Sequence, residues 1–174
     1  MIDALWTGWR SHYLSTLPNP FEGSHSEGQS VFTQILDSGL PDEETFIVHR
    51  GQLVFAIMNA YPYAVGHLMV LPIRQIANLD ELTSQESLEL WATVTHATEV
   101  LKSEYAPHGL NVGVNLGPAA GGSVSEHLHV HIVPRWRGDA NFMTSVANAK
   151  TISEPLNETA ARIRHAWTNC RSVS

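Results

Sequence analysis

Imidazole and aliphatic side chains alternate along one segment in the C-terminal half of the chain. Its residues, in order, are His127, Leu128, His129, Val130, His131 and Ile132. Because successive side chains of a β-strand point to opposite faces, this pattern predicts a strand whose aliphatic residues enter the core and whose three imidazoles line the other face. A neutral imidazole binds metal ions and attacks phosphorus as a nucleophile, so the row predicts a site of chemistry.

The spacing of these histidines favours an extended anionic ligand over a single metal ion. At ~3.3 Å per strand residue the outer pair lies ~13 Å apart, whereas a ligand of a zinc ion lies ~2.1 Å from it. His127 and His129 alone could share an ion, so a two-histidine metal site stays open. Neighbouring rings ~7 Å apart suit a chain of phosphates. A half-exposed strand face without any function is the remaining alternative.

The composition is that of one globular domain without a surplus of positive charge. The chain has 174 residues, 43% of them hydrophobic, with 10 Lys and Arg against 17 Asp and Glu and a formal net charge of -7. A nucleic-acid polymer is therefore not an expected partner. The lone Cys170 and the lack of a basic leader before an apolar run predict a cytoplasmic protein. Polar residues interrupt the apolar stretch 53–73, so no membrane span is expected.

Apolar runs along the chain predict an antiparallel sheet. The expected strands are residues 46–48, 53–58, 67–71, 110–116 and 126–133. The first two strands form a hairpin that turns at Gly51. In the fourth strand every second side chain is apolar and is expected in the core, namely Leu110, Val112, Val114 and Leu116.

Two helices are expected to pack on this sheet, which makes the fold class α+β. The long helix covers 83–104, because Thr83 and Glu86 match a capping box. Its expected core residues are Leu88, Trp91, Val94, Thr98 and Leu101. The C-terminal helix is expected to be capped by Ser153 with Pro155 in its first turn. Its expected core residues are Leu156, Ala160, Ile163 and Trp167.

The chain is expected to divide into three parts. Residues 1–30 form an N-terminal segment and loop, residues 31–150 form the main domain, and residues 151–174 form a C-terminal helical extension. The N-terminal segment has large apolar residues at roughly helical spacing, which predicts a short amphipathic segment: Leu5, Trp6, Trp9 and Tyr13.

Residues 127–133 resemble the signature of the histidine-triad (HIT) family, His-φ-His-φ-His-φ-φ, in which φ is apolar. The likeness covers roughly 48–136, and a second shared block contains Asn59, Gly66-His67, Val70-Leu71-Pro72 and Leu79-Asp80-Glu81-Leu82. The resemblance implies the HIT-like fold and a homodimer. It also implies a small nucleotide-binding hydrolase or transferase acting on nucleoside phosphoramidates or dinucleoside polyphosphates, with no cofactor.

The resemblance implies a catalytic set of His127, His129 and His131. His129 is expected to attack the α-phosphorus and become nucleotidylated, while its other ring nitrogen donates to the backbone carbonyl of His127. His131 is expected to hold the non-bridging α-phosphate oxygens. His127 and His67 are expected to support the phosphates and the nucleophile, and Asn59 is expected to bind the ribose.

The sequence departs from the common family pattern at several positions, and there it resembles one subgroup, the short bacterial diadenosine tetraphosphate phosphorylases. Gly122 stands where many members have glutamine, in a run 121–126 that is one residue longer. Gln75 stands where the family has the histidine of Pro-x-x-His. The opening segment 5–10 and the run 134–142 also resemble this subgroup.

The subgroup implies inorganic phosphate as the final acceptor. Gly121 and Gly122 allow backbone N–H groups to converge on an anion, and Ser123 adds a hydroxyl donor. The resemblance also places Asn115 and Trp136 among the contacts to substrate or phosphate. The expected reaction converts diadenosine tetraphosphate and phosphate into ATP and ADP. Hydrolysis of a phosphoramidate or a dinucleoside polyphosphate is the enzymatic alternative, a non-catalytic nucleotide-binding dimer is another, and pairing of dimers into tetramers stays open.

Overall fold

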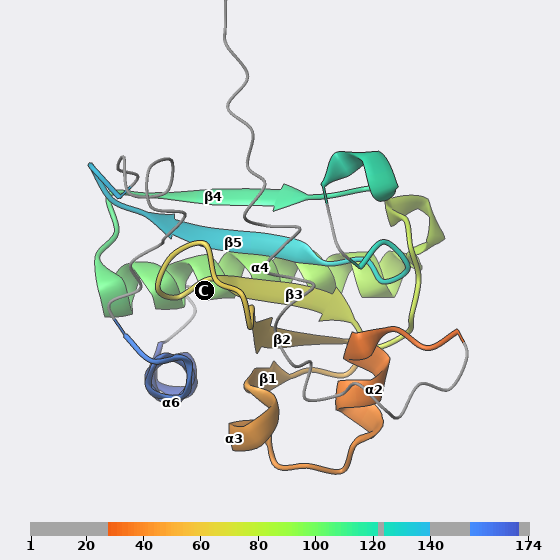
Figure 1. The fold of residues 1–174 in the computed structure, drawn as a ribbon, viewed down its shortest axis with the longest axis horizontal. Helices are drawn as coiled ribbons and strands as arrows, with labels where there is room; N and C mark the ends of the chain where they lie inside the picture. The colour runs from red at the N-terminus through yellow and green to blue at the C-terminus, as the bar shows by residue number, and fades with distance from the viewer. Residues whose placement is uncertain (1–27, 122–123, 140–153, 171–174) are drawn as a thin grey trace, which may run out of the picture.

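Five antiparallel strands form one sheet in the computed structural model, in the order β1-β2-β3-β5-β4 (Figure 1). The structure describes residues 28–121, 124–139 and 154–170. The strands are β1 (Ile47–Arg50), β2 (Val54–Met58), β3 (Leu68–Pro72), β4 (Gly109–Val114) and β5 (Val130–Arg135). The helices are α2 (Val31–Asp37), α3 (Asp42–Thr45), α4 (Ser84–Tyr105) and α6 (Leu156–Asn169), and 3-10 turns span Leu79–Glu81 and Pro118–Ala120. The α+β class and the antiparallel sheet are confirmed, and the predicted N-terminal amphipathic segment lies outside the described residues.

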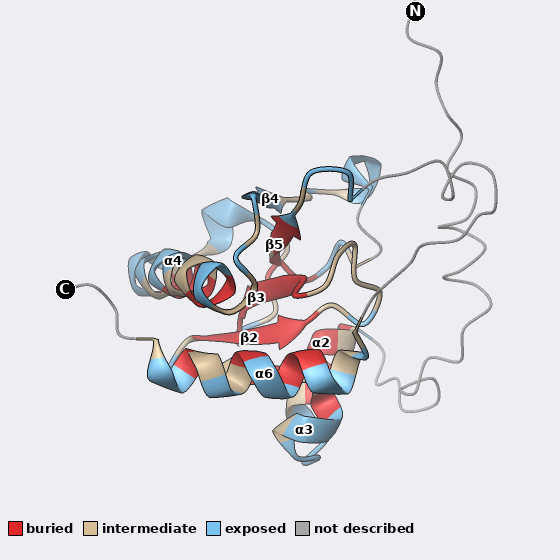
Figure 2. Cartoon of the chain, turned by 90° about the vertical axis from the view of Figure 1, so that its left-hand side faces the viewer, coloured by how far each residue is buried: buried red, intermediate tan, exposed pale blue. Residues whose placement is uncertain are grey.

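Different helices cover the two faces of the sheet (Figures 1 and 2). The face under α4 and α6 carries the buried strand residues Val54, Ala56, Val70, Val130 and Ile132. The opposite face packs against α2 through Ile47, Phe55, Ile57, Met69 and Leu71. His131 pairs with Met69 across β5 and β3, so the histidines belong to the α2 face. Full burial of one such aliphatic side chain stabilises the fold by about 1.5–3 kcal/mol, so both faces hold the sheet in place.

The β1–β2 hairpin turns at Gly51, as predicted. The Gly51 N–H donates to the Val54 carbonyl at 2.9 Å. The Glu89 carboxylate on α4 accepts the N–H groups of Gln52 and Leu53 at 2.8 and 3.1 Å. A Cβ atom at Gly51 would meet the end of the Glu89 side chain, so a larger residue there would displace the carboxylate through which α4 holds the hairpin.

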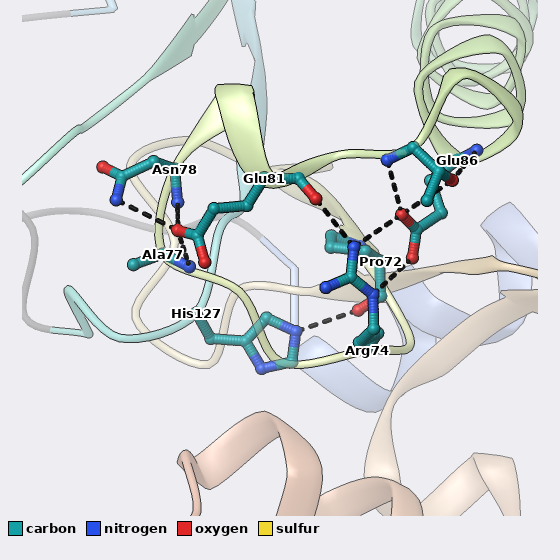
Figure 3. Close-up of polar contacts among 8 residues, drawn as sticks. Pro72, Arg74, Ala77, Asn78, Glu81, Glu86 and His127 are labelled. Carbon is teal, nitrogen blue, oxygen red and sulfur yellow. Dashed lines mark hydrogen bonds and ion pairs between the residues drawn. The ribbon is translucent and has the colours of Figure 1, made fainter.

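Helix α4 begins after the predicted capping box. The Thr83 hydroxyl accepts the Glu86 N–H at 3.2 Å, and the Glu86 carboxylate accepts the Thr83 N–H at 2.8 Å. Arg74 donates to the same carboxylate at 2.9 and 2.8 Å (Figure 3). The Arg74 guanidinium, together with the cap, lowers the pKa of Glu86 to about 2. The start of α4 is thereby tied to the segment that follows β3.

The predicted core face of α4 is partly wrong. Leu88 and Trp91 are 75% and 44% exposed, and Thr98 is half-buried. The buried residues of the helix that pack in the core are Leu90, Val94, Ala97, Val100 and Leu101. The helix has two apolar stripes, and the one with the small Ala97 at its centre faces the sheet. A small residue there allows the backbones of α4 and the sheet to approach closely.

Strand β4 is also less buried than predicted, because it is an edge strand. Val112 and Leu116 are 44% and 43% exposed, while Leu110 and Val114 are partly buried against the core. Alternation along the sequence predicts which side chains share a face. It does not predict that the strand lies at the edge of the sheet, where β5 is its one partner among the described strands.

The starts of β5 and α6 differ from the prediction, and β4 ends at Val114 instead of residue 116. β5 begins at Val130 and not at Glu126, so the first two histidines of the triad precede the strand. Helix α6 begins at Leu156 with Pro155 as its N-cap residue, and the predicted cap Ser153 lies outside the described residues. The predicted core residues of α6 are confirmed, because Ala160, Ile163 and Trp167 are buried and Leu156 packs against them. No helix in the described ranges is long and apolar enough to cross a membrane.

Candidate active site

The ring of His129 is held by a hydrogen bond to the backbone two residues earlier. Its Nδ1 lies 2.7 Å from the carbonyl oxygen of His127, which confirms the predicted contact. A carbonyl oxygen only accepts, so Nδ1 carries the proton and Nε2 of the neutral ring keeps its lone pair. The nitrogen available as a nucleophile is therefore Nε2.

Both ring nitrogens of His127 bind protein groups. Nε2 lies 2.9 Å from the carbonyl oxygen of Pro72 (Figure 3), and Nδ1 lies 2.7 Å from the hydroxyl of Ser30. The Pro72 carbonyl requires a proton on Nε2, so Nδ1 accepts the hydrogen bond from Ser30. The next peptide is fixed as well, because the Leu128 N–H donates to the Ile76 carbonyl at 2.6 Å. His127 thus anchors the backbone from which His129 extends.

The first two histidines are buried on the face of the sheet that α2 covers. His127 is 1% and His129 is 6% exposed, and the Phe32 ring of α2 lies 5.6 Å from each imidazole, measured between ring centroids. Burial lowers the pKa of both imidazoles below 6.5, because the cationic form loses its hydration. The environment therefore keeps the His129 ring neutral, which is the form that can attack an electrophile.

His131 and His67 form a directed pair beside the nucleophile. The backbone N–H of Tyr63 donates to Nδ1 of His67 at 3.0 Å, so the proton of neutral His67 lies on Nε2. This Nε2 is 3.0 Å from Nδ1 of His131 and donates to it. The chain of bonds leaves the proton of neutral His131 on its own Nε2. The amide nitrogen of Asn115 lies 3.4 Å from this Nε2. Because an amide nitrogen only donates, Asn115 accepts the His131 proton when its amide is turned so that the oxygen faces the ring.

Glycine is required immediately before His67, the residue that precedes β3. Gly66 has a φ of 77°, and a Cβ atom there would lie 3.1 Å from Leu101 and 3.3 Å from Pro134. The loop before it also holds Asn59, whose amide nitrogen is 3.4 Å from Nδ1 of His67. Asn59 and His67, both predicted as site residues, therefore lie next to each other, and His67 contacts His131 of the triad.

The distances between neighbouring imidazole rings are shorter than those predicted for a row along a regular strand. The ring centroids of His129 and His131 are 4.7 Å apart, and those of His67 and His131 are 5.1 Å apart. The predicted ~7 Å spacing assumed a regular strand. His129 instead precedes β5, so its ring turns toward His131. A nucleophilic nitrogen and a hydrogen-bond donor thus occupy one small site.

Trp136 was predicted as a site residue but is not brought to these rings. Trp136 follows β5 at the end away from His131, about 16 Å along the chain at ~3.3 Å per residue. It lines a separate cleft of about 480 Å³ together with Val65, Tyr105, Glu154, Pro155, Glu158 and Arg162. Gly121 is exposed and has a φ of 87° after the 3-10 turn, and Gly122 and Ser123 lie outside the described residues.

Four residues that contact the histidines were not predicted as site residues. Ser30 caps α2 and Phe32 lies on it, and Pro72 acts through its backbone carbonyl. Tyr63 contacts His67 through its backbone N–H and through its ring, 4.6 Å away between centroids. Ser30 has a local signal, because a serine before apolar residues spaced three and four apart is typical of a helix N-cap. A backbone donor such as that of Tyr63 leaves no signal in the sequence.

The described residues offer no group of three or more His, Cys, Asp or Glu side chains placed to hold a metal ion. The pair considered from the sequence, His127 and His129, commits three of its four ring nitrogens to Ser30, Pro72 and the backbone of His127. Sharing an ion between these two rings would require those hydrogen bonds to break.

Comparison with known proteins agrees with this geometry. A family model described as "HIT domain" matches residues 41–138, more than half of the chain. The chain belongs to the HIT family. A Mycobacterium tuberculosis protein named AP-4-A phosphorylase is 46% identical to this HIT protein over 167 residues, which cover 95% of this chain and 85% of that protein.

Two further relatives of this HIT protein are more distant. The bis(5'-adenosyl)-triphosphatase of Saccharomyces cerevisiae is 34% identical over 92 residues, or 52% of this chain and 44% of that protein. The crystal structure of a hypothetical histidine triad nucleotide-binding protein from Sulfolobus tokodaii is similar with a TM-score of 0.65 at 27% identity. It covers 80% of this chain and 93% of that chain.

The pH dependence of turnover should report the burial of the nucleophile. Burial lowers the pKa of His129, so the ring gains its second proton and loses the lone pair of Nε2 at a lower pH than an exposed imidazole does. We expect kcat/KM of this HIT protein to fall on the acid side with a midpoint below about pH 6.5. Kinetics on both sides of this midpoint, with stability checked at each pH, test the expectation, and an acid limb centred above about pH 6.5 would contradict it.

Proposed function

We propose that this HIT protein is a nucleotidyl transferase that cleaves dinucleoside polyphosphates, with diadenosine tetraphosphate as substrate and inorganic phosphate as the final acceptor. One observation carries the proposal. The hydrogen bond from Nδ1 of His129 to the His127 carbonyl leaves the Nε2 lone pair available beside the His131 ring. The relative named AP-4-A phosphorylase, 46% identical over 95% of this chain, supports the choice of substrate.

The reaction proceeds in two displacements at the same phosphorus. Nε2 of His129 attacks the α-phosphorus of diadenosine tetraphosphate, an N–P bond forms, and the P–O bond to the rest of the molecule breaks, releasing ATP. An oxygen of inorganic phosphate then attacks the adenylyl-histidine, and ADP leaves as the N–P bond breaks. The Nε2 proton of His131 stabilises the negative charge on the α-phosphate oxygens in both steps.

The remaining predicted contacts complete the substrate site. Asn59 binds the ribose, His67 orients His131, and Asn115, adjacent to Nε2 of His131, contacts the phosphates. The loop residues Gly121, Gly122 and Ser123 hold the incoming phosphate through N–H and hydroxyl donors. Trp136 contributes to nucleotide binding from the separate cleft that it lines at the far end of β5.

A second copy of the chain pairs along β4. This strand is an edge strand of the sheet, and its half-exposed apolar residues Leu110, Val112 and Val114 lie on the α4 side of the sheet. An open edge with apolar side chains favours pairing with another strand, and closure about a two-fold axis gives a homodimer. With a formal net charge of -7 and a lone cysteine, the chain is suited to the cytoplasm and to small nucleotide ligands in place of nucleic-acid polymers.

Hydrolysis is the competing reaction, because the yeast relative is named a triphosphatase. The experiment is incubation of the protein with diadenosine tetraphosphate, with and without inorganic phosphate, and separation of the nucleotide products. Phosphorolysis gives equal amounts of ATP and ADP only when phosphate is present. Formation of AMP at the same rate under both conditions, with no ADP, would contradict the phosphorylase assignment.

A further inference from the structure

The N-terminal end of helix α2 contacts the buried rings of the triad. Ser30, its N-cap residue, is fully buried, and its hydroxyl lies 2.7 Å from Nδ1 of His127. The same hydroxyl accepts the backbone N–H of Thr33 at 3.1 Å, which caps the helix. One side chain thus joins the start of α2 to the histidine that anchors the nucleophile.

The two hydrogen bonds of the His127 ring each have one direction. Nε2 of His127 donates to the Pro72 carbonyl, so Nδ1 accepts and the single hydroxyl proton of Ser30 must point to it. The hydroxyl of Thr33 lies 2.9 Å from Oε1 of Gln75 and 3.1 Å from the Ser30 hydroxyl, and both of these oxygens can accept its proton. The Ser30 proton has no such choice, so its bond to Nδ1 and the bond to Pro72 together hold the His127 ring in one rotation.

Gln75 fixes the position of Ser30 through the backbone. Its Oε1 accepts the Ser30 N–H at 2.8 Å, and its Nε2 donates to the Gly28 carbonyl at 3.0 Å. Gln75 lies between Pro72 and Ile76, whose carbonyls accept from His127 and Leu128. A single short segment after β3 therefore holds both the anchor histidine and the helix cap that contacts it.

An amide side chain suits position 75 better than the imidazole that the family pattern has there. Oε1 of Gln75 has two lone pairs, and it uses them to accept from the Ser30 N–H and from the Thr33 hydroxyl. A neutral imidazole offers only one acceptor nitrogen. Gln75, which stands in place of the family's histidine, therefore holds the N-cap residue Ser30 and the neighbouring Thr33 together.

We propose that the hydroxyl of Ser30, held in place by Gln75, is a positioning group for the nucleophile, which it orients through the His127 ring and carbonyl. This inference rests on the proposed function. Without the hydroxyl, a buried acceptor nitrogen of His127 loses its partner, and of the two ring hydrogen bonds only the one to the Pro72 carbonyl remains to hold the ring. The His127 carbonyl then shifts, and with it the direction of the His129 lone pair. A displacement near 1 Å at a reacting centre lowers a rate by roughly 100-fold.

The test compares substitutions at Ser30 that separate helix capping from the hydroxyl. Ser30→Gly removes the hydroxyl yet costs only a few tenths of a kcal/mol as a cap, and Ser30→Thr keeps both hydroxyl and cap. Ser38→Ala is the matched control, because it removes the side-chain bond to the Ile35 carbonyl at the other end of α2. Each protein is assayed for the rate of first-turnover adenylylation by diadenosine tetraphosphate, for KM and for thermal unfolding.

We expect Ser30→Gly to adenylylate roughly 10-fold to 100-fold more slowly with KM changed by less than about threefold. Ser30→Thr should restore the rate, and Ser38→Ala should keep it. In proton NMR spectra, the resonance of the His129 Nδ1 proton should move or exchange faster with solvent in Ser30→Gly alone. Unchanged adenylylation in folded Ser30→Gly would overturn the proposal.

A second variant keeps the test decisive if Ser30→Gly does not fold. Gln75→Met removes the bonds to Ser30 and Thr33 while leaving the cap hydroxyl in place, so its adenylylation rate should fall several-fold at unchanged KM. A wild-type rate in Gln75→Met would overturn the proposal. Failure of the proposed function is a separate result, because wild-type protein would then form no adenylylated enzyme at all.

Discussion

The variant His129→Asn is expected to lose nucleotidyl transfer almost completely, by roughly 10⁴-fold or more in kcat. The asparagine amide can still donate to the His127 carbonyl, as Nδ1 of His129 does at 2.7 Å, so the local backbone keeps its partner. An amide nitrogen has no available lone pair and cannot form the N–P bond. The loss is therefore chemical and not a consequence of unfolding.

Binding and turnover should separate in this variant. The dissociation constant for diadenosine tetraphosphate, measured by calorimetry, should stay within a few-fold of wild type, because the phosphate and ribose contacts are unchanged. His165→Asn, an exposed substitution on α6, is the matched histidine control and should retain full activity. Turnover of His129→Asn within tenfold of wild type would mean that another group attacks phosphorus.

Replacing His131 by alanine should lower kcat by roughly 10²-fold to 10³-fold, the loss typical of one donor to a developing oxyanion. The hydrogen bonds from the Tyr63 N–H to His67 and from His67 to His131 place a proton on Nε2 of His131, 4.7 Å from His129 between ring centroids. This donor is lost in the variant, while the nucleophile keeps its own hydrogen bond.

A double-mutant cycle tests whether His67 acts through His131. His67→Ala should also reduce kcat, because Nδ1 of His131 then loses its donor and the ring loses its fixed tautomer. The double variant should be about as slow as His131→Ala alone, since groups that act as a unit are not additive. Losses that multiply in the double variant, with all proteins folded by calorimetry, would show that the two imidazoles act independently.

Local patterns in the sequence predict much of this fold. The capping box of Thr83 and Glu86 starts α4, and Gly51 turns the first hairpin through its bond to the Val54 carbonyl. The alternation of histidines with aliphatic residues places Leu128, Val130 and Ile132 in the core, where all three are buried. These features depend on residues close in sequence, so they can be found without a structure.

Features that depend on tertiary contacts were missed or misplaced. Leu88 and Trp91 fit a helical stripe as well as Leu90 and Ala97 do, and only the packing against the sheet selects one of the two stripes. The contact of Ser30 with His127 joins residues 97 positions apart, and that of Gln75 with Ser30 joins residues 45 apart. Such pairings follow from the position of α2 on the histidine face, which no local pattern specifies.

The covalent intermediate is the most direct test of the central claim. Protein is mixed with diadenosine tetraphosphate labelled on its α-phosphates in the absence of inorganic phosphate. The reaction is stopped within the first turnover in strong base, in which N–P bonds survive, and the labelled peptide is mapped. The account predicts label on His129 that disappears into ADP when unlabelled inorganic phosphate is added before the quench. The account is contradicted if no histidine is labelled in the absence of phosphate while ATP and ADP form at the normal rate in its presence.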